Sequence, residues 1–126
     1  MPTVKNLMGA GCPALQAVAS VGVATTAFIP NGAGVQTGLT IPSDGVICTS
    51  IASSGYCQLP TAAVQNPGLF DSYILVNHSG STVQVSPTSA GKIANGSAGA
   101  AFAVTTGKTA FFYYIGSDNW AAALSA

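Results

Sequence analysis

Charge is the scarcest feature of this 126-residue chain, which contains no arginine and no glutamate. Three lysines and three aspartates are its only fully charged side chains, so 5% of its residues are charged and its net charge is zero. Soluble domains typically carry charge on about a quarter of their residues. The outer surface must therefore consist mostly of small polar residues, glycine and alanine, a composition that favours assembly over a free monomer.

The same scarcity excludes several classes of function. Three scattered lysines do not supply the counterion release on which nucleic-acid binding depends, so we exclude nucleic acid as a partner. Acid–base and metal-assisted catalysis need converging ionisable groups, and the chain offers three carboxylates and one histidine. Asp44, Asp71 and Asp118 lie in predicted turns, where a carboxylate usually caps backbone N–H groups. We predict that the protein is not an enzyme and uses no cofactor.

Cysteine is also sparse, and Cys12, Cys48 and Cys57 follow no spacing typical of a zinc site. His78 is the only imidazole, so we predict no metal site. An odd number of cysteines argues against a disulfide framework. A bridge between Cys48 and Cys57 across a hairpin is one alternative. Two unlinked core thiols are the favoured one, because free cysteine behaves as a small buried hydrophobe.

Long apolar runs are absent as well. Residues 6–43 carry no charge, but three prolines, several glycines and many hydroxyls interrupt them. A membrane-spanning helix needs about 20 predominantly apolar residues. A signal peptide needs an unbroken apolar region of roughly 7–15 residues, which Gly9, Gly11 and Pro13 prevent here. We therefore expect no membrane partner and no export, and we expect the chain to fold in a reducing cytoplasm.

Hydrophobic residues make up 48% of the chain, enough for one domain with a real core. Residues 1–22 are predicted to form an N-terminal arm with a short helix that begins at Pro13. The helix has a narrow apolar side and is too short to be stable alone, so we expect the arm to dock on its own domain or on a neighbouring subunit. Residues 23–126 are predicted to form a single β-rich domain.

Short β-branched and aromatic stretches separated by turn residues indicate that this domain is an antiparallel β-sandwich or barrel-like fold. Residues 23–42 are expected to be extended and poorly paired or to form edge strands. Two hairpins are expected, one around residues 52–55 and one around the loop at His78. The predicted strands lie at residues 45–51, 56–59, 73–76, 82–85, 101–104, 110–115 and 120–124.

Residues 111–115 place aromatic or aliphatic side chains on both faces of their strand. Both faces of a strand are apolar only when both are covered. The outer side is therefore covered by a second sheet, as in the middle of a sandwich, or by another subunit. Trp120 leaves the same two alternatives open, because core packing and interface anchoring both exploit its large apolar area.

Several short motifs follow one another along the chain in a characteristic order. Residues 6–17 read NLMGAGCPALQA, residues 59–60 read LP, and GKIANG, GKTA and DNW follow at residues 91–96, 107–110 and 118–120. This order resembles that of small virion proteins of tailed bacteriophages, of the head decoration (cement) type. The resemblance implies a β-rich subunit, commonly a homotrimer on the outer capsid surface, made in the host cytoplasm, with the major capsid protein as its other partner.

The resemblance implies a structural virion protein that binds the outer surface of a phage head and stabilises the shell by its preference for the assembled form. The alternative is a tail or head fibre component for host-surface recognition, with polar loops at His78 and Asn95 reading a glycan. An uncharged surface suits assembly, because an unpaired charge buried in an interface is costly. The expected capsid or subunit interface residues are Leu7, Leu15, Val18, Phe111, Tyr113 and Trp120.

Overall fold

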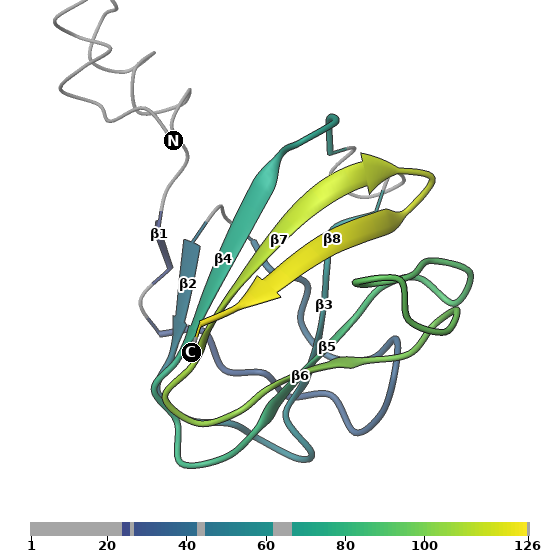
Figure 1. The fold of residues 1–126 in the computed structure, drawn as a ribbon. Helices are drawn as coiled ribbons and strands as arrows, with labels where there is room; N and C mark the ends of the chain where they lie inside the picture. Colours follow the sequence, from purple (N-terminus) through teal and green to yellow (C-terminus); the bar gives the residue numbers. More distant parts are fainter. Residues whose placement is uncertain (1–23, 26, 43–44, 62–66, 126) are drawn as a thin grey trace, which may run out of the picture.

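The computed structural model describes residues 24–25, 27–42, 45–61 and 67–125. The described part is built from strands joined by turns and loops, so the prediction of a mainly β fold is confirmed (Figure 1). The predicted arm and helix of residues 1–22 lie outside the described residues. The strands are β1 (Ala24–Thr25), β2 (Gly45–Cys48), β3 (Tyr56–Gln58), β4 (Ser72–Asn77), β5 (Val83–Ser86), β6 (Phe102–Val104), β7 (Thr109–Gly116) and β8 (Asn119–Leu124).

The strands form two sheets that mix parallel and antiparallel pairs, whereas antiparallel pairing was expected. The larger sheet has the order β1-β2-β4-β7-β8, in which β1, β2 and β4 are parallel and β7 is antiparallel to both of its neighbours. The smaller sheet has the order β3-β5-β6, with β3 parallel and β6 antiparallel to β5. Single bridges join Gly32 to Tyr56 and Thr40 to Gln58, in keeping with the poorly paired segment expected at residues 23–42.

Both predicted hairpins are wrong, because the chain changes sheet at each expected turn. β2 and β3 belong to different sheets, and so do β4 and β5. The alternating burial of these strands indicated that one face of each is buried, but it did not indicate which strand lies alongside. Within the described chain, only β7 and β8 form a hairpin between consecutive strands (Figure 1).

The buried side chain of Asn77 organises one of these crossings. Its Nδ2 donates hydrogen bonds to the carbonyl oxygens of Ser81 and Val104, at 2.9 and 2.8 Å. Its Oδ1 accepts hydrogen bonds from the backbone N–H and the hydroxyl of Ser79, at 3.0 and 2.6 Å. The four bonds satisfy the side-chain amide completely, although Asn77 is fully buried. They fix the corner through which the chain leaves β4 and enters β5, with His78 exposed beside it.

The core lies between the inner faces of the two sheets. Phe102 of β6 meets Phe112 of β7 edge to face, with ring centroids 5.6 Å apart, so an aromatic pair joins the sheets. Trp120 packs edge to face on Tyr73 and Tyr114, with ring centroids 5.6 and 5.0 Å apart. Its side chain is only 2% exposed. These contacts make Trp120 a member of the core.

Cys48 and Cys57 are free and buried, which confirms the prediction of two unlinked core thiols. They come from β2 and β3 and therefore from different sheets. Burial raises the pKa of the Cys48 thiol to about 11. The pKa of Cys57 is also raised, by burial and then by its proximity to Cys48. Both thiols therefore act as apolar core groups at neutral pH.

Replacing Asn77 with alanine tests the role of the corner. N77A removes the partner of the buried Val104 carbonyl and of the buried Ser79 N–H, together with the bonds to the Ser81 carbonyl and the Ser79 hydroxyl, so we expect the free energy of unfolding to fall by about 3 kcal/mol. The measurement is urea unfolding followed by circular dichroism. N119A is the control. The half-buried Asn119 side chain accepts a hydrogen bond from the Lys92 N–H, so this variant should lose about 1 kcal/mol or less. Equal losses in the two variants would contradict this role.

Candidate functional site

The larger sheet has an inner face that packs on the smaller sheet and a face that points the other way, which we call the outer face. The register places Phe111 opposite Ile74 and Ala123, and places Tyr113 opposite Ala121, so these side chains share that face. The second sheet therefore covers only one side of β7, the side of Phe112 and Tyr114. The apolar residues of the outer face are Ile47, Ile74, Val76, Phe111, Tyr113, Ile115, Ala121 and Ala123.

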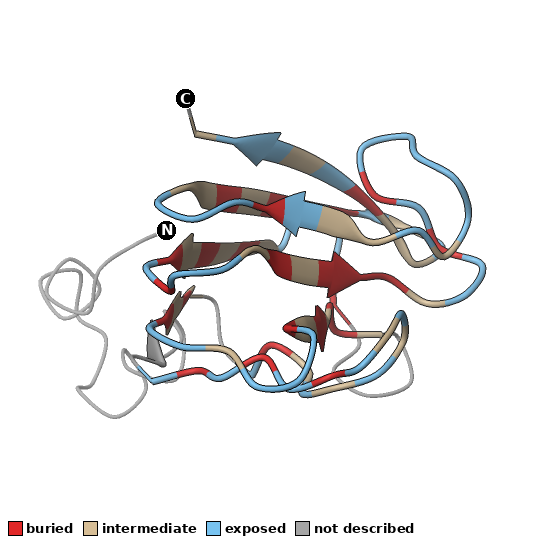
Figure 2. Ribbon diagram, turned by 90° about the horizontal axis from the view of Figure 1, so that it is seen from below, coloured by how far each residue is buried: buried red, intermediate tan, exposed pale blue. Residues whose placement is uncertain are grey.

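The outer face is apolar, uncharged and partly open to solvent. Tyr113 and Ile115 are 40% and 49% exposed, and none of the outer-face residues belongs to the buried core. Buried residues alternate with intermediate or exposed ones along the strands of this sheet (Figure 2). The four charged residues that the structure describes, at positions 71, 92, 108 and 118, all lie outside the strands. An apolar face of this kind marks an interaction surface more often than a free one.

A tight turn at residues 68–71 carries a second apolar feature, next to the outer face. Leu69 and Phe70 are 67% and 75% exposed, more than any other large apolar side chain in the described chain. The Asp71 N–H donates to the Gly68 carbonyl at 3.0 Å, and the Asp71 carboxylate accepts the Gly68 N–H at 2.7 Å. The turn is therefore closed from both ends, with its apolar pair outside.

Two backbone bonds tie this turn to β7 in the form of a β-bulge. The Phe70 N–H donates to the Tyr114 carbonyl at 2.7 Å, and the Tyr114 N–H donates to the Asp71 carbonyl at 3.0 Å. Two consecutive residues therefore face one residue of the partner strand. Phe70 has a φ of 64°, in the left-handed region where glycine is the usual occupant of such a bulge.

The conformation of Phe70 is unfavourable for the isolated subunit. A bulky residue in the left-handed region destabilises the fold by on the order of 1 kcal/mol or more. The ring of Phe70 is largely exposed, so its burial offsets little of this free energy. Strain of this kind persists where the surrounding structure imposes it, and it often marks a binding site. The turn therefore holds Leu69 and Phe70 exposed to solvent at a cost to subunit stability.

A third apolar feature is a groove built by the extended segment that follows β1. Its volume is about 370 Å³, and its lining residues are Ala27, Phe28, Ile29, Leu39, Thr40 and Pro42. Leu39 and Ile29 are 47% and 41% exposed, whereas Phe28 is buried. A cavity of roughly 150 Å³ holds a benzene molecule, so the groove has room for a large apolar side chain. None of the described residues that line it is charged.

The groove is held in shape by backbone bonds to both sheets. The Phe28 N–H donates to the Ile47 carbonyl of β2, and the Ile41 N–H donates to the Gln58 carbonyl of β3, at 3.2 and 2.9 Å. On the same segment, the Leu39 N–H is bound by the Asn31 side chain at 3.0 Å. The groove is therefore a formed part of the fold.

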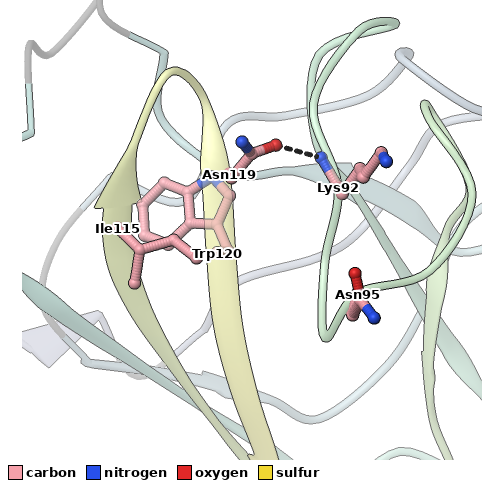
Figure 3. Close-up of a pocket in the computed structure, with 5 residues that line it drawn as sticks. All are labelled: Lys92, Asn95, Ile115, Asn119 and Trp120. Atoms are coloured by element: carbon pink, nitrogen blue, oxygen red, sulfur yellow. Dashed lines mark hydrogen bonds between the residues drawn. The ribbon is translucent and has the colours of Figure 1, made fainter.

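A smaller pocket of about 250 Å³ lies beside the turn between β7 and β8 (Figure 3). Lys92, Asn95, Ile115, Asn119 and Trp120 line it, and the Asn119 Oδ1 accepts the Lys92 N–H at 3.0 Å. Because Trp120 is 2% exposed, its ring offers no open surface on which a sugar could stack.

The two loops expected to read a glycan are not brought together. His78 follows the last residue of β4, and its N–H donates to the Cys48 carbonyl at the end of β2. Asn95 lines the pocket beside the β7–β8 turn, which lies near the start of β4, because β7 runs antiparallel to β4. The loops therefore lie at opposite ends of the larger sheet.

The predicted interface residues have three different outcomes. Leu7, Leu15 and Val18 lie outside the described residues. Phe111 and Tyr113 lie on the outer face, whereas Trp120 lies in the core. Sequence reasoning missed the turn and the groove. The signal for the turn was a pair of large apolar residues, Leu69 and Phe70, between the turn formers Gly68 and Asp71.

The described residues contain no group of three or more His, Cys, Asp or Glu side chains placed to hold a metal ion. Within the same part of the chain, no helix has the length and apolar character needed to cross a bilayer.

The strain at Phe70 gives a direct prediction. F70G places the residue with the least steric penalty at a positive φ, so we expect the free energy of unfolding of the dilute subunit to rise by about 1 kcal/mol. L69G is the control in the same turn, because Leu69 has no positive φ and the added backbone freedom should lower stability by about 0.5–1 kcal/mol. Urea unfolding measures both values. A loss of stability in F70G as large as that in L69G would contradict the strain.

Comparisons of the chain with protein-family models, with curated proteins and with solved structures found no match. The proposal below therefore rests on the residues of this chain.

Proposed function

We propose that this chain is a structural virion protein that decorates the outer surface of a bacteriophage head as a homotrimer and stabilises the shell. The observation that carries the proposal is the uncharged apolar outer face, which is exposed at Tyr113 and Ile115. The second sheet packs on the opposite face of the same strands, so the described fold supplies a core without using the outer one.

Apolar burial without charge is well suited to a contact that is repeated by symmetry. Burial of apolar surface contributes roughly 25 cal/mol per Å², and a standard interface buries about 800 Å² on each partner. Burying the outer face costs no free energy for the desolvation of charged groups, because the described charges lie outside the strands. A protein that binds the assembled shell more tightly than its separated subunits stabilises the shell by that difference.

Two of the motifs that resemble phage decoration proteins lie in contact at one end of the larger sheet. The Trp120 N–H donates to the Lys92 carbonyl at 2.8 Å, and the Ala94 N–H donates to the Trp120 carbonyl at 2.9 Å. Residues 91–96 and 118–120, which are far apart in the sequence, therefore form one hydrogen-bonded unit. This contact supports the view that the resemblance concerns a shared structural unit.

The fibre alternative receives less support. Glycan sites combine an exposed aromatic ring with nearby free polar groups. Phe70 is an exposed ring, but the carboxylate of its neighbour Asp71 is bound to the Gly68 N–H, and Leu69 is apolar. This combination favours an apolar partner.

Binding to phage heads assembled without this protein tests the proposal. We expect the full-length chain to sediment with the heads in a saturable manner. Y113K, which places a charge on the outer face, should weaken binding by roughly tenfold or more. V35K is the matched control, because Val35 is 47% exposed and lies outside the outer face, the turn and the groove. Binding to host cells but not to heads, or equal binding by Y113K and wild type, would contradict the proposal.

A further inference from the structure

We propose that copies of this chain join head to tail, with Leu69 and Phe70 of one copy seated in the apolar groove of the next. The partner is therefore a second copy of the same chain. The inference rests on the homotrimer in the proposed function and names the contact that builds it, but it does not depend on the phage head.

The turn does not fill the groove of its own subunit. Leu69 and Phe70 are 67% and 75% exposed, and neither lines the groove in the described chain. They precede the start of β4, whereas Phe28, which lines the groove, bonds to Ile47, and Ile47 pairs with Val76 near the end of β4. The apolar pair of the turn and the groove are therefore separate surfaces of one subunit.

The two surfaces match in chemistry and size. The exposed pair of the turn is purely apolar, and the described lining of the groove consists of five apolar residues and one threonine. The charged group of the turn, the Asp71 carboxylate, already accepts the Gly68 N–H at 2.7 Å at the base of the turn. A volume of about 370 Å³ accommodates the ring of Phe70.

The strain at Phe70 favours this occupant over another segment of the same chain. Residues 1–23 directly precede β1 in the sequence, and Ala27 of the groove follows β1. If that segment filled the groove, Phe70 would stay exposed at a positive φ, and no burial of its ring would offset the strain. Insertion of Phe70 into the groove of a neighbouring copy explains both the exposed, strained ring and the open apolar groove.

The contact continues onto the outer face. Leu69 and Phe70 alone bury less than the roughly 800 Å² per partner of a standard interface. Phe70 bonds to Tyr114, whose neighbours Tyr113 and Ile115 are exposed on the outer face. The turn is therefore the anchor of a larger apolar surface, in the manner of a hot spot within a wider contact.

The symmetry of the assembly follows from the two different surfaces. A contact between unlike patches is heterologous, and it closes into a ring when the rotation between neighbours permits. In a homotrimer of this kind, each subunit gives one turn and receives one.

Native mass spectrometry of the full-length chain tests the contact. We expect the wild type to be a trimer, and we expect F70G and L39K to lose it, with subunit affinity weakened roughly tenfold or more. V35K is the matched control for L39K, because both side chains are 47% exposed, and it should remain a trimer. L39S replaces L39K if circular dichroism shows that the latter is unfolded. A monomeric wild type, or a trimer in F70G or L39K, would overturn the inference.

Mixing the two variants separates this contact from other occupants of the groove. A copy carrying L39K keeps its turn, and a copy carrying F70G keeps its groove, so an equimolar mixture should form a one-to-one heterodimer through one intact contact. Absence of the heterodimer would show that the turn and the groove do not bind each other, as expected if residues 1–23 fill the groove. A wild-type trimer that does not bind heads would contradict the proposed function and leave this contact standing.

Discussion

The buried amide of Asn77 is the interaction on which the arrangement of the two sheets depends. Its four side-chain bonds hold the corner after β4, and its backbone is paired with Lys108 and Gly107, just before β7. One residue thus links the end of β4, the entry to β5, the end of β6 and the start of β7. Because a fully buried amide must satisfy all its hydrogen bonds, few other arrangements of these segments are available.

This corner determines which face of the larger sheet becomes a surface. Once β5 and β6 pack beneath β4 and β7, the alternation of side chains assigns Phe112 and Tyr114 to the core and Phe111, Tyr113 and Ile115 to the outside. The scarcity of charge along the chain then makes that outside face apolar and neutral. The strained turn with Leu69 and Phe70, and the groove, supply the two unlike surfaces of the proposed contact between copies. The proposed assembly uses all three surfaces, which are the outer face, the turn and the groove.

Sequence periodicity predicted where most strands lie but not which strands pair. The expected strand at residues 110–115 falls within β7, and those at 73–76 and 101–104 match β4 and β6. Alternation reports burial of one face, and it carries no information on whether a turn returns the chain to the same sheet or to the other one. The hairpin at His78 was therefore wrong, because the bonds of Asn77 that make the crossing are long-range or depend on burial.

The candidate site was predicted in part for a similar reason. The apolar run of residues 111–115, which places such side chains on both faces of the strand, led to the choice of Phe111 and Tyr113. Trp120 fits core and interface equally well by composition and lies in the core. The positive φ of Phe70 arises from the bulge opposite Tyr114, and the groove arises from packing of residues 27–42 against β2 and β3, so neither has a local signal. Leu7, Leu15 and Val18 stay predictions.

Association through uncharged apolar surfaces is tested most directly by the salt dependence of self-association, measured by sedimentation equilibrium of the full-length chain. Charge-driven contacts are screened as the Debye length falls from about 10 Å at 0.1 M to 3 Å at 1 M salt, whereas apolar burial is not. We expect the dissociation constant of the trimer to stay the same or to decrease across this range. An increase of roughly tenfold or more would show that charged groups drive the association and would contradict the account.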